Sequence, residues 1–161
     1  MNMNDLQHLE AHLKGKAIIL GIGARMRSDD AAGSVLAVRL QGRMPFEVFD
    51  AGPSPENYLG KIVRQKPDSV IIIDAVDFGG KPGECRVLEG ADVKTANLFS
   101  THNASISLVA DYLQNNLTTD IMILAVQPRS VAFGEGLSPE VSKTLALLEE
   151  WFYAAVKKTE G

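Results

Sequence analysis

The feature that most constrains the fold is a short apolar run in the middle of the chain, residues 70–76, interrupted only by Asp74. A continuous apolar run of this length is typical of a strand that is buried on both faces. Residues 17–20 form a second run of the same kind and end at Gly21. Strands buried on both faces belong to parallel sheets that helices cover from each side, so the sequence predicts an α/β fold.

Strand-like and helix-like segments alternate along the rest of the chain. Further strands are predicted at residues 46–50, 84–88 and 120–126. The segment 84–88 alternates with half of its positions polar, which predicts a strand at or near an edge of the sheet. Together with right-handed crossovers between parallel strands, this pattern predicts a three-layer α/β/α sandwich with a mainly parallel five-stranded sheet.

Helices are predicted where apolar residues recur at helical spacing. These segments lie at about 32–40, from about 55 onward, at 106–113 and at 139–155. Ser28 or Asp29 is predicted to cap the first helix, and Ser138 with Pro139 marks the start of the last.

Length and charge limit the classes of function. The 161 residues fit one domain, 1–161, with residues 1–15 as an N-terminal extension. The net charge is −4 and no Lys/Arg cluster is present, which argues against a nucleic-acid partner. No apolar run is long enough to span a bilayer, and the first 16 residues lack the apolar core of a signal peptide. We therefore expect a cytoplasmic protein without a membrane partner.

Polar residues follow several of the predicted strands at the points where those strands end. They are residues 21–30, Asp50, Asp74 with Asp77, residues 100–103, and Gln127 to Arg129. In open α/β sheets, ligands bind beyond the carboxyl ends of the strands. The sequence therefore predicts a functional site at this edge.

Asp74 is the most informative of these residues. A carboxylate that closes a buried strand costs several kcal/mol if it is dry and unpaired, so it is hydrated, hydrogen-bonded or bound to a cation. One interpretation is that Asp74 caps a neighbouring turn. The other is that Asp30, Asp74 and His102, which are expected on the same edge, supply two carboxylates and an imidazole to a divalent transition metal. Spacing alone does not identify the metal.

Other patterns point to competing chemistry, and each is incomplete. Gly21-Ile22-Gly23 begins like a dinucleotide-binding motif, but Met26 stands where the third glycine is required. His8 and His12 are not in the H-E-x-x-H order of zinc proteases, and we interpret them as a solvated polar face. The single cysteine, Cys85, is interpreted as a small buried hydrophobic residue. Ser54, Ser100 and Ser105 lie in no nucleophile elbow.

Five motifs in order along residues 16–149 resemble the [NiFe]-hydrogenase maturation proteases, and most closely their hydrogenase 3-type branch. They are Gly21-Ile22-Gly23 with Asp29-Asp30-Ala31-Ala32-Gly33, Asp50-Ala51-Gly52, Ile73-Asp74-Ala75, Thr101-His102-Asn103, and Gln127-Pro128. Each motif alone is weakly specific, whereas the set in this order and spacing is specific.

The resemblance implies an endopeptidase that removes the C-terminal extension of a hydrogenase large-subunit precursor once nickel has been inserted. It implies that Asp30, Asp74 and His102 contact that nickel, which the substrate carries and which serves as the recognition feature. Other divalent cations can occupy the site in the free protein. The resemblance assigns no nucleophile, so the catalytic residues stay unknown; Asp29, Asp50 and Asp77 are candidates for support of the site or general-base work.

The sequence departs from the family pattern near the site. Ala24 replaces the family asparagine, Arg25 and Arg27 stand where apolar residues are usual, and Ala51 replaces a glycine. The loss of the asparagine motivates a second hypothesis, a non-proteolytic module that binds the nickel-loaded precursor as a checkpoint. A nucleotide-binding α/β protein is a third hypothesis, against which the missing glycine argues.

Overall fold

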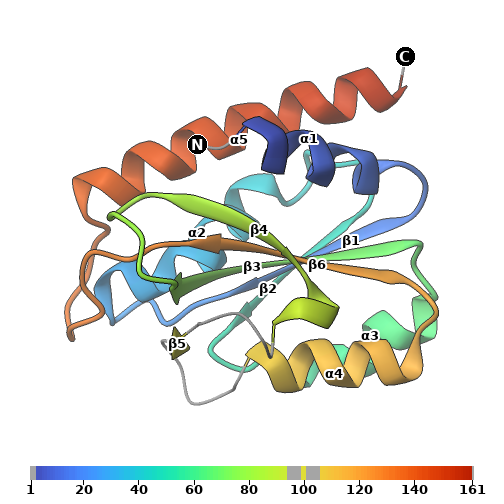
Figure 1. Cartoon of the computed structure of the whole chain (residues 1–161), viewed down its shortest axis with the longest axis horizontal. Coiled ribbons are helices and arrows are strands. Elements are labelled where there is room, and N and C mark those ends of the chain that lie inside the picture. Colours follow the sequence, from blue (N-terminus) through green and yellow to red (C-terminus); the bar gives the residue numbers. More distant parts are fainter. Residues whose placement is uncertain (1–2, 94–98, 101–105, 161) are drawn as a thin grey trace.

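Six strands and the helices between them make up the computed structural model, which describes residues 3–93, 99–100 and 106–160 (Figure 1). The strands are β1 (Ala17–Ile22), β2 (Glu47–Gly52), β3 (Ser69–Asp77), β4 (Cys85–Glu89), β5 (Phe99–Ser100) and β6 (Asp120–Val126). The α-helices are α1 (Met3–Glu10), α2 (Ala32–Leu40), α3 (Glu56–Gln65), α4 (Ile106–Asn116) and α5 (Pro139–Glu160). Short 3-10 helices are η1 (Ala11–Leu13), η2 (Ser28–Ala31) and η3 (Gly90–Asp92).

The main sheet has the strand order β2-β1-β3-β6-β4. β1, β2, β3 and β6 are parallel, and β4 runs antiparallel to β6 at the edge. The predicted three-layer sandwich with a mainly parallel sheet is therefore confirmed, as is the edge position of the fourth strand. The two-residue strand β5 was not predicted; it pairs antiparallel with the last residues of β3.

Two separate cores cover the two faces of the sheet, because successive side chains of a strand point in opposite directions. Ile71, Ile73 and Ala75 of β3 pack in the core made with α1, α2 and α5. Ile72 and Val76 pack in the core made with α3 and α4. Figure 1 shows these two helical layers above and below the sheet. Complete burial of each large aliphatic side chain contributes about 1.5–3 kcal/mol, which fixes the central strand in place.

The N-terminal extension is part of the first core. Leu6, Leu9 and Leu13 are 1%, 0% and 2% exposed and join the cluster under α5. The carboxylate of Asp5 also accepts a hydrogen bond from the backbone N–H of Val87 at 3.1 Å. α1 thus occupies a backbone donor on the edge strand β4, which reduces that edge's ability to pair with another chain.

Of the two predicted helix caps, one is confirmed and the other is wrong. The Ser138 cap is confirmed, because its Oγ accepts a hydrogen bond from the N–H of Val141 at 3.3 Å, with Pro139 as the first helical residue. The prediction that Ser28 or Asp29 caps α2 is wrong. Both lie in η2, where Ser28 Oγ donates to Ala132 O at 2.8 Å and the Asp29 carboxylate binds a distant loop.

Cys85 is buried, as predicted, and burial raises the pKa of its thiol. His8 Nε2 lies 3.3 Å from Glu89 Oε1, and His12 Nε2 lies 3.4 Å from Asp120 Oδ2. Within residues 3–93, 99–100 and 106–160, no group of three or more metal-ligating side chains is arranged to hold a metal ion. Across those same residues, every helix is too short or too polar to cross a bilayer.

Candidate functional site

The loops after β1, β3 and β6 gather at one end of the sheet, beside β5 (Figure 1). This is the carboxyl edge of the parallel strands, where ligands bind in open α/β sheets. The backbone N–H of Gly23, just after β1, donates to the carbonyl of Gly52 at the end of β2 at 2.9 Å. The loops at this edge are therefore joined to one another by the backbone as well as by side chains.

Asp30 is placed at this edge by a tight turn after β1. The N–H of Asp30 donates to Arg27 O at 3.0 Å, and its carbonyl accepts from the N–H of Ala24 at 3.2 Å. A Cβ on Gly23 would lie 2.6 Å from that same carbonyl, so only glycine permits the approach. Asp30 is 1% exposed.

The same segment is pressed against β3, the strand that carries Asp74. A Cβ added at Gly33 would lie 2.1 Å from the carbonyl oxygen of Ile73 and 2.3 Å from that of Ile22. The chain at Gly33 therefore runs directly over the ends of β1 and β3, and η2 contacts β3. Asp30 lies three residues before Gly33 and Asp74 follows Ile73, so both residues belong to segments near this contact.

Asp74 lies inside the sheet rather than in a loop. It belongs to the central strand β3, pairs with Ala125 of β6, and is 0% exposed. By strand alternation its side chain shares a face with Ile72 and Val76, the face covered by α3 and α4. Both carboxylates are therefore buried at the carboxyl end of the sheet, and their sharing of one ligand site stays a prediction.

The third predicted ligand, His102, lies outside the described residues. The last described residue before it is Ser100 of β5, which pairs with Val76, two residues after Asp74. The first described residue after it is Ile106, where α4 begins.

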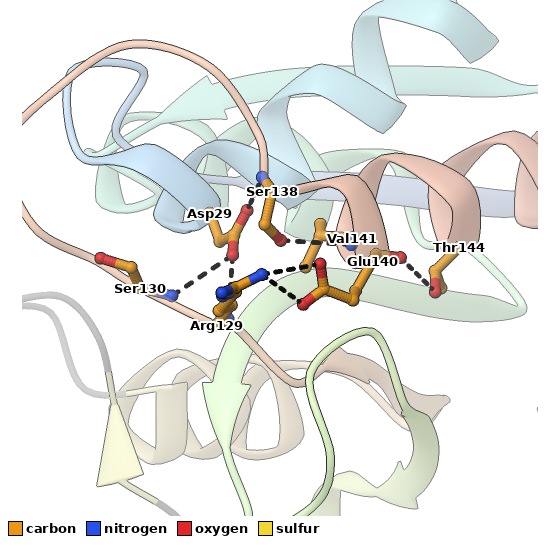
Figure 2. A network of polar contacts seen from close by, with 7 residues as sticks. All are labelled: Asp29, Arg129, Ser130, Ser138, Glu140, Val141 and Thr144. Atoms are coloured by element: carbon orange, nitrogen blue, oxygen red, sulfur yellow. Dashed lines mark hydrogen bonds and ion pairs between the residues drawn. The ribbon is translucent and has the colours of Figure 1, made fainter.

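Asp29, next to Asp30, has a different role, which sequence reasoning missed (Figure 2). Its Oδ2 accepts hydrogen bonds from the N–H groups of Arg129 at 2.9 Å and Ser130 at 3.3 Å, and its Oδ1 accepts from the N–H of Ser138 at 2.7 Å. One carboxylate, 1% exposed, thereby holds both ends of the loop that links β6 to α5. Backbone amides account for its acceptor positions, so we assign Asp29 a positioning role and not that of a base.

Gln127 at the end of β6 performs a similar task for the loop after β3. Its Oε1 accepts from the N–H groups of Phe78 at 2.9 Å and Gly80 at 3.1 Å, and its Nε2 donates to Asp77 Oδ1 at 3.1 Å. Because these partners lie about 50 positions earlier in the chain, the sequence alone offers no signal for the contact.

Asp50 is likewise part of the framework. Its Oδ1 accepts from Ser34 Oγ and from the N–H of Gly52, which ties the end of β2 to α2. Its Oδ2 lies 3.5 Å from a guanidinium nitrogen of the exposed Arg25. The three acidic candidates for support, Asp29, Asp50 and Asp77, therefore all stabilise loops around Asp30 and Asp74.

Chemically, this edge offers carboxylate oxygens in a protein interior. Burying such groups costs free energy, and a bound cation offsets that cost. A pocket of about 230 Å³ opens beside Asp30 and is lined by Arg25, Ala31, Val35, Glu135, Gly136 and Leu137. This pocket has room for a side chain or a short segment of a larger molecule.

Comparison with known proteins identifies the family. The model of the hydrogenase maturation protease family matches residues 33–154. The hydrogenase 3 maturation protease of Escherichia coli K12 is 31% identical over 118 residues, covering 72% of this chain and 75% of that protein. The crystal structure of a [NiFe] hydrogenase maturation protease from Thermococcus kodakarensis KOD1 superposes with a TM-score of 0.82 at 33% identity, covering 93% of this chain and 99% of that one.

A crystal structure of a hydrogenase 3 maturation protease gives a TM-score of 0.72 at 27% identity over 86% of this chain and 89% of that one. The family match covers Asp74 and position 102, and the structural match to the Thermococcus protein covers nearly the whole fold. This chain therefore belongs to the hydrogenase maturation protease family and is a peptidase.

Proposed function

We propose that this chain removes the C-terminal extension of a [NiFe]-hydrogenase large-subunit precursor after nickel has been inserted. The observation that carries the proposal is the burial of Asp30 and Asp74, each at most 1% exposed, at the carboxyl end of the sheet in a member of this protease family. As the sequence predicts, we place this reaction in the cytoplasm.

In this proposal the nickel belongs to the substrate. Asp30, Asp74 and His102 complete its coordination, and the metal supplies Lewis-acid character beside the scissile bond. Their role is to hold the precursor so that the peptide bond lies at a fixed place relative to these side chains, which lowers the barrier by making the reaction effectively intramolecular. Water adds across the peptide bond and leaves a new carboxylate on the large subunit and a free amine on the tail.

The buried position of the two carboxylates supports a gating role for the metal. A precursor without nickel would lack the cation that the carboxylate oxygens of Asp30 and Asp74 can bind. A nickel-loaded precursor supplies that cation. The preference for the loaded form therefore follows from the electrostatics of the edge.

The test uses the purified precursor with and without nickel, and mass spectrometry of its C-terminus. Wild-type protein is expected to shorten only the nickel-loaded form, and Asp74→Asn and His102→Ala are expected to leave it full length. Asp120→Asn, which changes an acid with a 74% exposed side chain at the opposite end of the sheet, is the control.

Two results would contradict the proposal. Full activity of Asp74→Asn would remove that residue from the mechanism. Tight binding of the loaded precursor by wild-type protein without any loss of mass would instead establish the non-proteolytic checkpoint module that Ala24 suggests.

A further inference from the structure

The loop between β6 and α5 carries an apolar side chain that the fold leaves in water. Phe133 is 82% exposed, more than any other large hydrophobic residue in the described part of the chain. Met26, in the loop after β1, is 46% exposed. The N–H of Gly134, the residue after Phe133, donates to Met26 O at 2.7 Å, which joins the two loops next to these residues. We call Phe133 and Met26 the apolar tip.

The apolar tip sits on a firmly attached loop. Ser28 N–H donates to Gly134 O at 2.8 Å, Ser28 Oγ donates to Ala132 O at 2.8 Å, and Arg27 Nε donates to Val131 O at 3.2 Å. Asp29 adds the three amide hydrogen bonds at the two ends of the loop, two of which Figure 2 shows converging from Ser130 and Ser138. Ser28 adopts a left-handed backbone with φ of 53°, a conformation that costs free energy outside glycine and that these contacts maintain.

This combination of rigidity and exposure calls for an explanation outside folding. Folding gains almost nothing from a phenyl ring that stays 82% exposed. A ring held in place before binding loses little entropy when a partner covers it, and aromatic anchors of this kind dominate the energy of many protein interfaces.

The position of the apolar tip identifies the partner. Residues 26–29, to which the loop is attached, lead directly into Asp30. A protein that covers the tip would have its adjoining segments next to Asp30. We propose that the apolar tip is the docking contact for the folded body of the hydrogenase large-subunit precursor, independent of its nickel. This assignment rests on the proposed function and adds a second point of recognition to it.

The test compares Phe133→Ser and Phe133→Leu with wild-type protein in the tail-removal assay. Met3→Ser is the matched control, since Met3 is a 64% exposed hydrophobic residue on α1. For Phe133→Ser we expect KM for the nickel-loaded precursor to rise about ten-fold with kcat within a factor of two, the size expected for loss of an interface anchor. The KM of Phe133→Leu should lie between those of wild type and Phe133→Ser, and the KM of Met3→Ser should equal that of wild type.

A binding measurement separates docking from recognition of nickel. Phe133→Ser is expected to weaken binding of the nickel-free precursor by the same factor, whereas Met3→Ser should leave that binding unchanged. The melting temperature of Phe133→Ser should equal that of wild type, because the ring contributes little to the core.

The possible failures are distinguishable. If wild-type protein does not shorten the precursor, the proposed function and this assignment fall together. If wild-type protein is active and Phe133→Ser has an unchanged KM, only the docking assignment is overturned. A fall in kcat or in melting temperature without a change in KM would also overturn it, as would a wild-type dimer that Phe133→Ser converts to monomer without affecting KM.

Discussion

The two ends of the sheet use acidic residues in opposite ways. At the carboxyl end, Asp29, Asp30 and Asp74 are 1%, 1% and 0% exposed. At the other end, Asp68 and Asp120 are exposed and lie beside Lys16 and His12. A cavity of about 590 Å³ opens at that second end, along residues 66–68 and 114–119, yet it holds no comparable buried charge. Because burying a carboxylate is costly, the place where the chain accepts that cost is a better guide to function than the size of a cavity.

The largest effect is expected from Asp30→Asn. The substitution keeps the size of the side chain and removes its negative charge, so the corner loses part of its attraction for a metal-bearing substrate. We expect tail removal to fall about 100-fold, the magnitude typical of losing one preorganised electrostatic group.

Asp120→Asn is the corresponding change at the other end and should leave activity unaltered. Equal activity of Asp30→Asn and wild type in the precursor assay would show that the difference in burial between the two ends has no functional meaning.

The second effect concerns stability. Asp29→Ala removes an acceptor of three backbone hydrogen bonds from a buried position. At about 1 kcal/mol for each bond, the free energy of unfolding should fall by about 3 kcal/mol. Asp68→Ala removes the acceptor of one such bond, from Lys16 N–H at 2.8 Å, and should cost about 1 kcal/mol. Urea denaturation of the two variants measures the contrast, and equal losses would contradict the assignment of Asp29 as the anchor of the loop.

A third effect concerns Gln127, the other side chain that holds a loop at the carboxyl end of the sheet. Gln127→Ala removes the acceptor for Phe78 and Gly80 and should cost about 2 kcal/mol. Cys85 begins the strand that follows this loop, is 6% exposed, and has a thiol pKa raised by burial. In wild type it should therefore react slowly with a thiol reagent at pH 8, since little thiolate forms and access is poor.

Cys85 of the Gln127→Ala variant should react faster with the thiol reagent, because the loop before Cys85 is no longer held to β6. The same reaction with Gln65→Ala serves as the control, because its side chain donates to the exposed Glu47 near the opposite end. Identical labelling rates for wild type, Gln127→Ala and Gln65→Ala would show that Gln127 does not restrain the loop.

The sequence predicted the sheet better than the loops, for a physical reason. Residues 17–22 and 69–77 are recognisable as strands because burial on both faces leaves a local apolar pattern. β5 has two residues and exists only through its pairing with β3, so no local pattern marks it. The role of α1 was readable in principle, since Leu6, Leu9 and Leu13 recur at helical spacing, but their polar surroundings suggested an extension outside the core.

For the site as well, predictions from topology differ from predictions that use only neighbouring residues. Topology alone predicted that Asp30 and Asp74 lie at the carboxyl end of the sheet, because the ends of parallel strands share an edge. The capping role predicted for Asp29 was wrong because its real partners lie 100 and more positions along the chain. A local rule for helix starts cannot anticipate such contacts. Metal binding at this edge, the identity of the metal and the role of His102 stay predictions.

The smallest effect is expected at the end of the sheet that we consider structural. His12 Nε2 lies 3.4 Å from Asp120 Oδ2, and the Asp120 side chain is 74% exposed. Solvent screens a pair of this kind, so Asp120→Asn should change the free energy of unfolding by less than about 0.5 kcal/mol. Urea denaturation at low and high salt measures this. A loss comparable to that of Asp29→Ala would mean that exposed acids at this end contribute as much as buried ones, and exposure would then no longer separate the two ends.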